Sequence, residues 1–478
     1  MTISTPFCLS TPIKTHTKLY NDEQPFNIQS KTFQQWVHYF NDDNISRQEK
    51  TAQAKHYLDD LIKTIDPASL SQMSWLNDSS SVKRYFEQQH QRTGKEFQHY
   101  LQQRQSHAPR RYFKTISHAF EFLYKVAPVK YVDGAWLYSC VHHPQRRLMQ
   151  DLIFIYLEEL GLGDPAANHV RMYQQLLQQF ELETYTERLS DAYYEQAAVQ
   201  MALAYAPEEY MALVIGFNLA YEQLPLHLLI THYELKELGI DPQYFTVHIT
   251  IDNAHQGHAF RSIRAFKHNL HQAQDREKFL NLVKYGFIMN DLGLSSTDII
   301  QTLDTSEHVL QVMQAKATVG QYLHNDKCQF SGKTINQWLS NTDQVQNFLN
   351  ILIEKQWIIL DQPVEHSRFW QMIDQPQGRM FGVFSRTEKQ FIRDWIEGNL
   401  AQSKLHPSVQ STQNISLGDL DSEIQIQAVK EKLSSIKHPL EQLQSLVPYL
   451  APHRHHQDVG LWATQRYSQV LFPFHTQP

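Results

Sequence analysis

The spacing of apolar residues predicts helices along most of the chain. Between about residues 31 and 105, apolar side chains recur three and four positions apart within a polar background, which is typical of amphipathic helices. From Arg110 to about residue 275 the chain becomes more apolar and aromatic, so we expect the central core there. Prolines and glycines divide this core into predicted helices at 111–126, 129–141, 145–160, 166–180, 190–206, 208–235 and 242–273. The pattern predicts an all-α fold built around a seven-helix bundle.

Changes in composition predict the domain boundaries. We expect an extended arm at 1–30, an N-terminal helical region at 31–108, a central helical domain at 109–275, a C-terminal helical domain with a short hairpin at 276–400, and a linker and C-terminal tail at 401–478. The hairpin is predicted from the apolar run at 357–360 and the segment GRMFGVFS at 378–385, where β-branched and aromatic residues lie beside glycine. The segment FSGKT at 330–334 lacks an earlier glycine of a phosphate-binding loop, so we interpret it as a helix start.

Charge and composition narrow the function classes. The chain has 478 residues with 43 Lys and Arg against 50 Asp and Glu, and a net charge of −7 gives no electrostatic reason to bind nucleic acid or an anionic membrane. No window of 18 apolar residues and no secretory signal is present, so we expect a cytoplasmic protein without a membrane span. Three scattered cysteines exclude a disulfide framework and a thiolate zinc site. With 26 histidines, a bound metal would be held by imidazole and carboxylate.

The strongest chemical signal lies in the segment DPQYFTVHITIDNAHQGHAF. His248, Asp252 and His255 stand at positions i, i+4 and i+7, which places them within a wedge of about 60° on one helix face, and His258 borders this wedge. The remaining positions are largely apolar, and a mostly buried helix does not carry such side chains unless they have partners. The competing interpretation is a His-rich surface helix with one Asp.

Two further residue patterns add candidate ligands. Glu159 closes an apolar helix, and His169 follows a Gly-Leu-Gly-Asp-Pro turn that is able to bring the carboxylate and the imidazole together. Glu222 is the only charged residue within a long apolar segment, where an ionised carboxylate normally has a partner or a metal. An ordinary helix end competes with the first interpretation, and a structural hydrogen bond competes with the second.

Taken together, E-x9-H, a lone Glu and H-x3-D-x2-H in a seven-helix core resemble the haem-oxygenase-like diiron oxidases and oxygenases, over about residues 110–275. The resemblance implies a haem-oxygenase-like seven-helix bundle with additional N-terminal helices and a C-terminal, mostly helical domain. It also implies two Fe(II) per chain and O2 as co-substrate. The ligands carried over by position are Glu159, His169, Glu222, His248, Asp252 and His255, with Asp133 and His258 as less certain additions. Asp133 stands where some members have Glu, and Asn218 matches the family spacing better than Glu222 but is not a carboxylate.

The activity implied by the resemblance is O2-dependent oxidation of a small organic substrate. Relatives act on amino acids, amines or fatty acids by N-oxygenation, desaturation or C–C cleavage. Arg261 and Arg264 follow the predicted ligand helix and are candidates to meet a substrate carboxylate, with a solvated helix face as the alternative. Haem binding or degradation by the same fold, and a non-catalytic helical interaction protein, remain open alternatives, as does a homodimer. We interpret His453, His455 and His456 as residues of an exposed loop.

Overall fold

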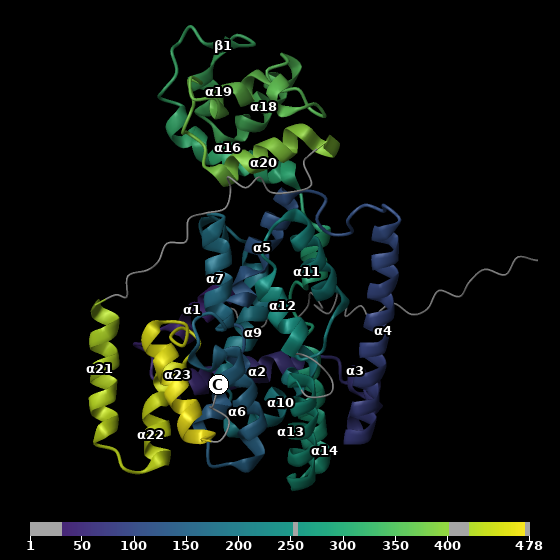
Figure 1. The fold of residues 1–478 in the computed structure, drawn as a ribbon, viewed down its shortest axis with the longest axis vertical. Helices are drawn as coiled ribbons and strands as arrows, with labels where there is room; N and C mark the ends of the chain where they lie inside the picture. Colours follow the sequence, from purple (N-terminus) through teal and green to yellow (C-terminus); the bar gives the residue numbers. More distant parts are fainter. Residues whose placement is uncertain (1–30, 252–256, 401–419, 474–478) are drawn as a thin grey trace, which may run out of the picture.

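The structure is a computed structural model that describes residues 31–251, 257–400 and 420–473. Within these ranges it contains 23 α-helices, several short 3₁₀ helices and one two-stranded hairpin, so the all-α prediction is confirmed. The predicted arm at 1–30 and the predicted linker up to residue 419 lie outside the described residues. Figure 1 shows a tall central bundle, a second helical unit above it and a small group of helices beside it.

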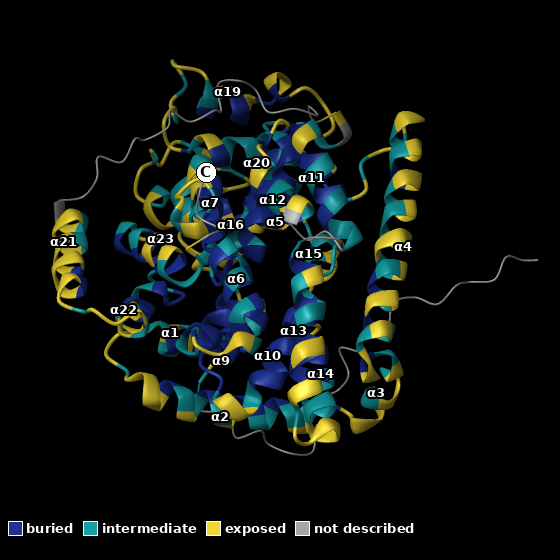
Figure 2. Cartoon of the chain, turned by 60° about the horizontal axis from the view of Figure 1, so that its bottom comes forward, coloured by how far each residue is buried: buried dark blue, intermediate teal, exposed yellow. Residues whose placement is uncertain are grey.

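The central bundle is formed by the N-terminal helices and the core helices together. The N-terminal helices are α1 (Phe33–Asn41), α2 (Arg47–Thr64), α3 (Pro67–Ser71) and α4 (Ser79–Gln105). The core helices are α5 (Ile116–Lys130), α6 (Gln150–Glu159), α7 (His169–Gln179), α8 (Glu183–Thr186), α9 (Glu195–Ala204), α10 (Met211–Tyr221), α11 (Leu226–Leu238), α12 (Gln243–Ile251), α13 (His258–Gln272) and α14 (Arg276–Met289). Figure 2 shows burial concentrated in helices such as α9 and α10, while α4 at the edge is largely exposed.

The tightest helix pair in the bundle is α10 with α14. Gly216 on α10 lies against the backbone of Val283, and Gly286 on α14 lies against the backbone of Leu213, so a Cβ at either glycine would clash with a carbonyl group. Close backbone approach through small residues joins the two helices into one packing unit. The domain boundary predicted at residue 276 therefore lies before α14, although α14 packs against α10 as part of the bundle.

Several predicted core helices differ in their ends. The prediction of one helix over 208–235 is wrong, because α10 and α11 are separated at Pro225 and the two parts are bent by 49°. The prediction of one helix over 242–273 is also wrong, because Gly257, the N-cap of α13, has an extended backbone with φ −83° and ψ −159°. Pro128 lies in the last turn of α5 and does not end it, and a 3₁₀ helix at Ala135–His142 replaces much of the predicted helix 129–141.

One membrane-related finding concerns the same bent pair. Among the described residues, no single helix combines the length and apolar composition that crossing a membrane requires. The segments Glu208–Tyr221 and Leu226–Leu238 meet that requirement only when counted together across their bend. The residues of α10 are almost all buried inside the bundle.

The unit above the bundle shares one apolar core with α5, α7 and α11 of the bundle and rests on α5. Its elements are α15 (Ser296–Gln301), α16 (Thr305–Gly320), β1 (Gln329–Phe330), β2 (Lys333–Thr334), α17 (Ile335–Leu339), α18 (Val345–Glu354), α19 (Arg368–Asp374) and α20 (Arg386–Glu397). Contacts from α15, α16 and α20 all reach α5, as Figure 1 also indicates. Because α5 leads directly into one of the candidate ligands, this unit supports the site from above.

The hairpin in this unit is not the one that the sequence predicted. The strands at 329–330 and 333–334 are joined by Ser331 and Gly332, which both have positive φ, at 49° and 80°. Thr334 then caps α17, so the predicted helix start in this segment is confirmed. In the segments at 357–360 and 378–385, Ile358 and Phe384 are buried in the apolar core, and core packing accounts for the pattern taken as strands.

The C-terminal helices pack beside the bundle. They are α21 (Leu420–Ser434), α22 (Pro439–Leu446) and α23 (Asp458–Leu471), and Figure 1 places α22 and α23 next to α6. The prediction of an exposed His cluster before α23 is wrong for His455, which is 1% exposed. Its Nδ1 atom lies 3.1 Å from the side-chain amide of Asn168, which is also buried.

Candidate metal centre

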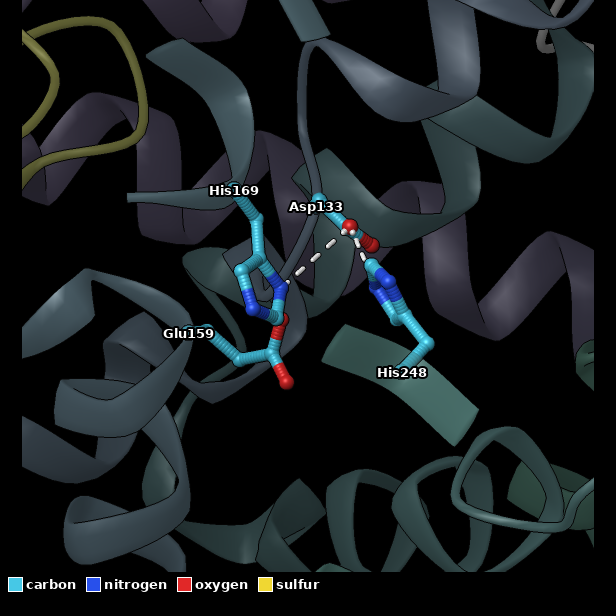
Figure 3. A group of neighbouring side chains, drawn as sticks. All are labelled: Asp133, Glu159, His169 and His248. Carbon is cyan, nitrogen blue, oxygen red and sulfur yellow. Dashed lines mark hydrogen bonds and ion pairs between the residues drawn. The ribbon is translucent and has the colours of Figure 1, made fainter. Parts of the chain in front are cut away.

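Two groups of buried carboxylates and imidazoles meet inside the bundle. The first contains Asp133, Glu159, His169 and His248, each offering one atom within 4.8 Å of the others, and its members are drawn in Figure 3. The second contains Glu159, Glu222 and His258 within the same limit. Glu159 belongs to both groups, so the two potential metal positions share one carboxylate.

The turn between α6 and α7 brings Glu159 and His169 together. Glu159 is the last residue of α6, and His169 is the first residue of α7. Gly161 and Gly163 between them have positive φ values of 67° and 91°, which glycine adopts without steric cost. As a result, the Nδ1 atom of His169 lies 2.5 Å from Oε2 of Glu159. This is the convergence expected from the Gly-Leu-Gly-Asp-Pro turn.

Asp133 reaches the same place from the turn after α5. The next residue, Gly134, has a φ of 77°, and a Cβ there would lie 2.9 Å from the Cβ of Glu159. The Asp133 carboxylate accepts hydrogen bonds from the hydroxyls of Tyr221 at 2.9 Å and Tyr244 at 2.6 Å. Glycine is therefore needed at 134 for the two acids to approach, and the two tyrosines orient the shorter one.

His248 completes the first group from α12. Its Nε2 atom lies 3.1 Å from Oδ2 of Asp133. Its Nδ1 atom lies 2.7 Å from the carbonyl oxygen of Tyr244, and only an N–H group is able to donate to a carbonyl. In the neutral ring the lone pair is then on Nε2 and faces the site, which is the arrangement that metal-binding histidines typically have.

His258 forms the second group from the start of α13. Its Nδ1 atom lies 3.2 Å from Oε1 of Glu159 and 3.2 Å from Oε2 of Glu222. Its Nε2 atom lies 3.2 Å from Oε2 of Glu158. The two oxygens of Glu159 thus face different histidines, Oε2 towards His169 and Oε1 towards His258, as in a carboxylate that bridges two cations.

Burial and charge act against each other in this cluster. Burial by itself raises the pKa of Asp133, but the Lys130 charge and the His248 hydrogen bond lower it to about 2. Against the effect of burial, the neighbouring imidazoles also hold the pKa of Glu159 well below its usual range. Burial alone lowers the pKa of His258, and its neighbouring carboxylates raise it well above the ordinary value. The site therefore favours ionised acids together with positive charge between them.

The unsatisfied atoms of the cluster fit a metal ion. Oε2 of Glu159 and Nδ1 of His169 are buried and lack a hydrogen-bond partner of ordinary geometry, although they lie 2.5 Å apart. Buried polar atoms without partners are costly, and a cation between them removes that cost. Carboxylate oxygens and imidazole nitrogens are donors that suit iron.

The sequence-predicted site residues have different outcomes. Glu159, His169, Glu222 and His248 lie in the two groups, and so do Asp133 and His258, which the resemblance treated as less certain. Asp252 and His255 lie outside the described residues. His258 was placed at the margin because the wedge assumed one continuous helix, whereas Gly257 directly before it is the N-cap of α13.

Other side chains near the site were not found from the sequence. Tyr221 and Tyr244 lie far apart in the chain, and no spacing pattern links them to Asp133. Glu222 is the C-cap of α10 and not a mid-helix residue. Asn218, the alternative to Glu222, accepts a hydrogen bond from the Trp136 indole at 2.9 Å and donates one to Ser262 at 2.6 Å, so its amide has a structural partner on each side.

Comparison with known proteins agrees with this chemistry. Residues 120–286 match the model of a family described as iron-containing redox enzymes. The match includes α6, α7, α10, α12 and α13 and the turn after α5, and therefore every residue of the two groups. No curated protein and no solved structure matches the chain.

Proposed function

We propose that this protein is a non-haem diiron oxidase or oxygenase, because residues 120–286 match the model of a family described as iron-containing redox enzymes. It uses O2 to oxidise a small organic substrate. The observation that carries the proposal is the position of Glu159, whose two oxygens face two separate buried groups. A carboxylate shared in this way suits a pair of iron ions better than one ion.

The residues have distinct roles in this proposal. Glu159 would be shared by the two positions, His169, His248 and Asp133 would hold one iron, and His258 and Glu222 would hold the other. Bound Fe(II) supplies the electrons that reduce O2. Tyr244 keeps the ring of His248 oriented through its carbonyl and the Asp133 carboxylate through its hydroxyl. Asp252 and His255 are proposed as additional ligands, on the resemblance alone.

A carboxylate-bearing substrate is the class that we propose. Arg261 and Arg264, the cations first considered for it, both form ion pairs with Asp151. Lys130 is a better candidate, because its ammonium lies 5.5 Å from the ring centre of Tyr244 and 5.9 Å from that of Tyr221 and, among the described residues, makes no ion pair with a carboxylate.

The Lys130→Met variant tests this assignment. We expect KM for an acidic substrate to rise about tenfold with little change in kcat, since a ground-state contact is lost. Lys114→Met, which changes a lysine before the other end of α5, is the matched control. An unchanged KM in Lys130→Met would remove Lys130 from the substrate site.

The two alternative functions make different demands on the site. A haem protein of this fold needs one histidine as a ligand of the haem iron. Here three buried carboxylates surround the histidines, and they would have to pack against the uncharged face of the porphyrin, which is unfavourable. In a purely structural protein the buried acids would only lower the stability of the fold. Ionisable groups with perturbed pKa values concentrate at functional sites, which favours a function for these acids.

Anaerobic titration with Fe(II) tests the proposed function. We expect binding of about two Fe(II) per chain, followed by O2 consumption that increases with the correct amino acid, amine or fatty acid. Glu159→Gln should reduce the stoichiometry, while Asp151→Asn, which changes another buried acid on α6, should preserve it. Less than about one Fe(II) per chain in every condition, or a Soret band on haem addition, would reject the diiron assignment.

A further inference from the structure

The C-terminal segment contacts the turn that carries two of the proposed ligands. Gly163 lies so close to α23 that a Cβ there would clash with the carbonyl of Leu461. The Tyr156 hydroxyl on α6 donates to the carbonyl of Leu450 at 2.5 Å, and Arg171 on α7 forms an ion pair with Asp458 at 2.7 Å. These contacts join residues beyond 286, where the family match ends, to both sides of the turn.

Asn168 is the centre of this contact. It is completely buried and is the N-cap of α7, with Oδ1 accepting a hydrogen bond from the Arg171 amide at 3.0 Å. Its Nδ2 atom donates to the carbonyl of Leu160 at 3.2 Å and to Nδ1 of His455 at 3.1 Å. One side chain therefore connects the end of α6, the start of α7 and the segment before α23.

These hydrogen bonds are made by residues that are direct neighbours of the proposed ligands in the chain. Leu160 directly follows Glu159, and Asn168 directly precedes His169. Any shift of the Asn168 amide changes the separation of the two ligand residues, whose donor atoms lie 2.5 Å apart. His455 is the acceptor that anchors this amide from outside the turn, because its ring is itself buried among bundle side chains.

We propose that His455 and Asn168 are positioning residues of the metal centre, and that the C-terminal segment is a necessary part of it. The proposal rests on the proposed function, in which Glu159 and His169 bind metal. The Asn168 amide, oriented by Nδ1 of His455, sets the spacing between the carboxylate and the imidazole before metal binds. Metal affinity then depends on a residue that contacts neither metal nor substrate.

Co(II) titration of the full-length protein under anaerobic conditions tests this role, with visible absorption reporting the coordination geometry. His455→Leu removes the ring acceptor and leaves only the more distant backbone carbonyl of residue 455, 3.5 Å from Nδ2 of Asn168, so we expect its Co(II) affinity to fall at least tenfold with an altered spectrum. His455→Asn places an oxygen near the position of Nδ1 and should restore most of both signals. Asp458→Asn weakens the neighbouring contact between α7 and α23 without touching Asn168, so its titration should match the wild type.

A second variant protects the test against a folding defect in His455→Leu. Asn168→Ser keeps a side-chain oxygen for the N-cap but loses the amide donor, so it should show the same loss of affinity with a smaller loss of stability. Wild-type affinity and spectrum in either His455→Leu or Asn168→Ser would overturn the proposal while leaving the proposed function intact. Failure of the wild-type protein to bind Co(II) or Fe(II) would overturn the proposed function itself.

Discussion

Two of the regions in which histidine is buried differ completely in their surroundings. At the candidate metal centre, His169 and His258 lie within hydrogen-bond distance of carboxylates, which raise their pKa against the effect of burial. On α16, His308 lies against Phe391 of α20 with ring centres 3.6 Å apart, and burial lowers its pKa to about 3. Its Nδ1 atom lies 3.2 Å from the Tyr124 hydroxyl.

Burial by itself therefore does not identify a histidine as a metal ligand. A histidine among aromatic rings stays neutral and contributes as a packed side chain, whereas a histidine among acids creates a place for a cation. The 26 histidines therefore do not all have the same role, and a buried histidine is a candidate metal ligand only where carboxylates lie next to it. Four predictions test this comparison, and they follow in order of decreasing expected effect.

The largest effect should come from the shared ligand. Glu159→Ala removes a donor from both groups, so we expect Fe(II) binding to weaken about 100-fold or more at both positions. His258→Ala removes a donor from the second group only and should leave about one Fe(II) per chain. Anaerobic Fe(II) titration measures both stoichiometries, and equal losses in the two variants would contradict the bridging role of Glu159.

The second effect is metal-dependent stability. Fe(II) at about 100 times its Kd should stabilise the wild-type protein by about 2.7 kcal/mol, because it binds the folded state alone. His308→Phe should keep this increment, and Glu159→Ala should lose it. Anaerobic thermal unfolding with and without Fe(II) checks the difference, and a lost increment in His308→Phe would connect the two regions.

The third effect concerns the turn between α6 and α7. Gly161→Ala places a Cβ against the backbone of Ala167 at a φ of 67°, so we expect the free energy of unfolding to fall by about 2 kcal/mol and Fe(II) affinity to fall with it. Gly94→Ala, inside α4 where an added Cβ would meet no atom within 4 Å, is the control and should not lower stability or Fe(II) affinity. Urea unfolding with Fe(II) titration measures both quantities. Similar losses in the two variants would show that the α6–α7 turn is not specially constrained.

The smallest effect is the pH dependence contributed by His308. Its folded pKa of about 3 lies below the unfolded value of about 6.5, so folding favours the neutral ring and its contribution is fully present above pH 6.5. Lowering the pH from 6.5 to 5.5 should cost about 1 kcal/mol of unfolding free energy through this residue. His308→Phe should remove that part of the pH dependence in urea unfolding, whereas parallel profiles for variant and wild type would exclude it.

The predictability of the site differs between its two halves. Glu159 and His169 were found from the sequence because a glycine turn joins them within a short stretch of chain. His258 was placed at the margin of the predicted face because helical periodicity applies only while a helix continues, and Gly257 before it has an extended backbone. The pairing of Asp133 with Tyr221 and Tyr244 joins three separate elements, which local pattern does not encode.

The sequence by itself determined the all-α class, most helix positions, the chemistry of the donor set and the family resemblance, since these depend on local periodicity and residue type. Only the tertiary structure decided that Glu159 faces two groups, that α14 joins the bundle through Gly216 and Gly286, and that His455 lies against the ligand turn. Each of these depends on side chains distant in sequence packing at short range. Such contacts follow from how the helices cross, and the spacing of residues along one helix does not contain that information.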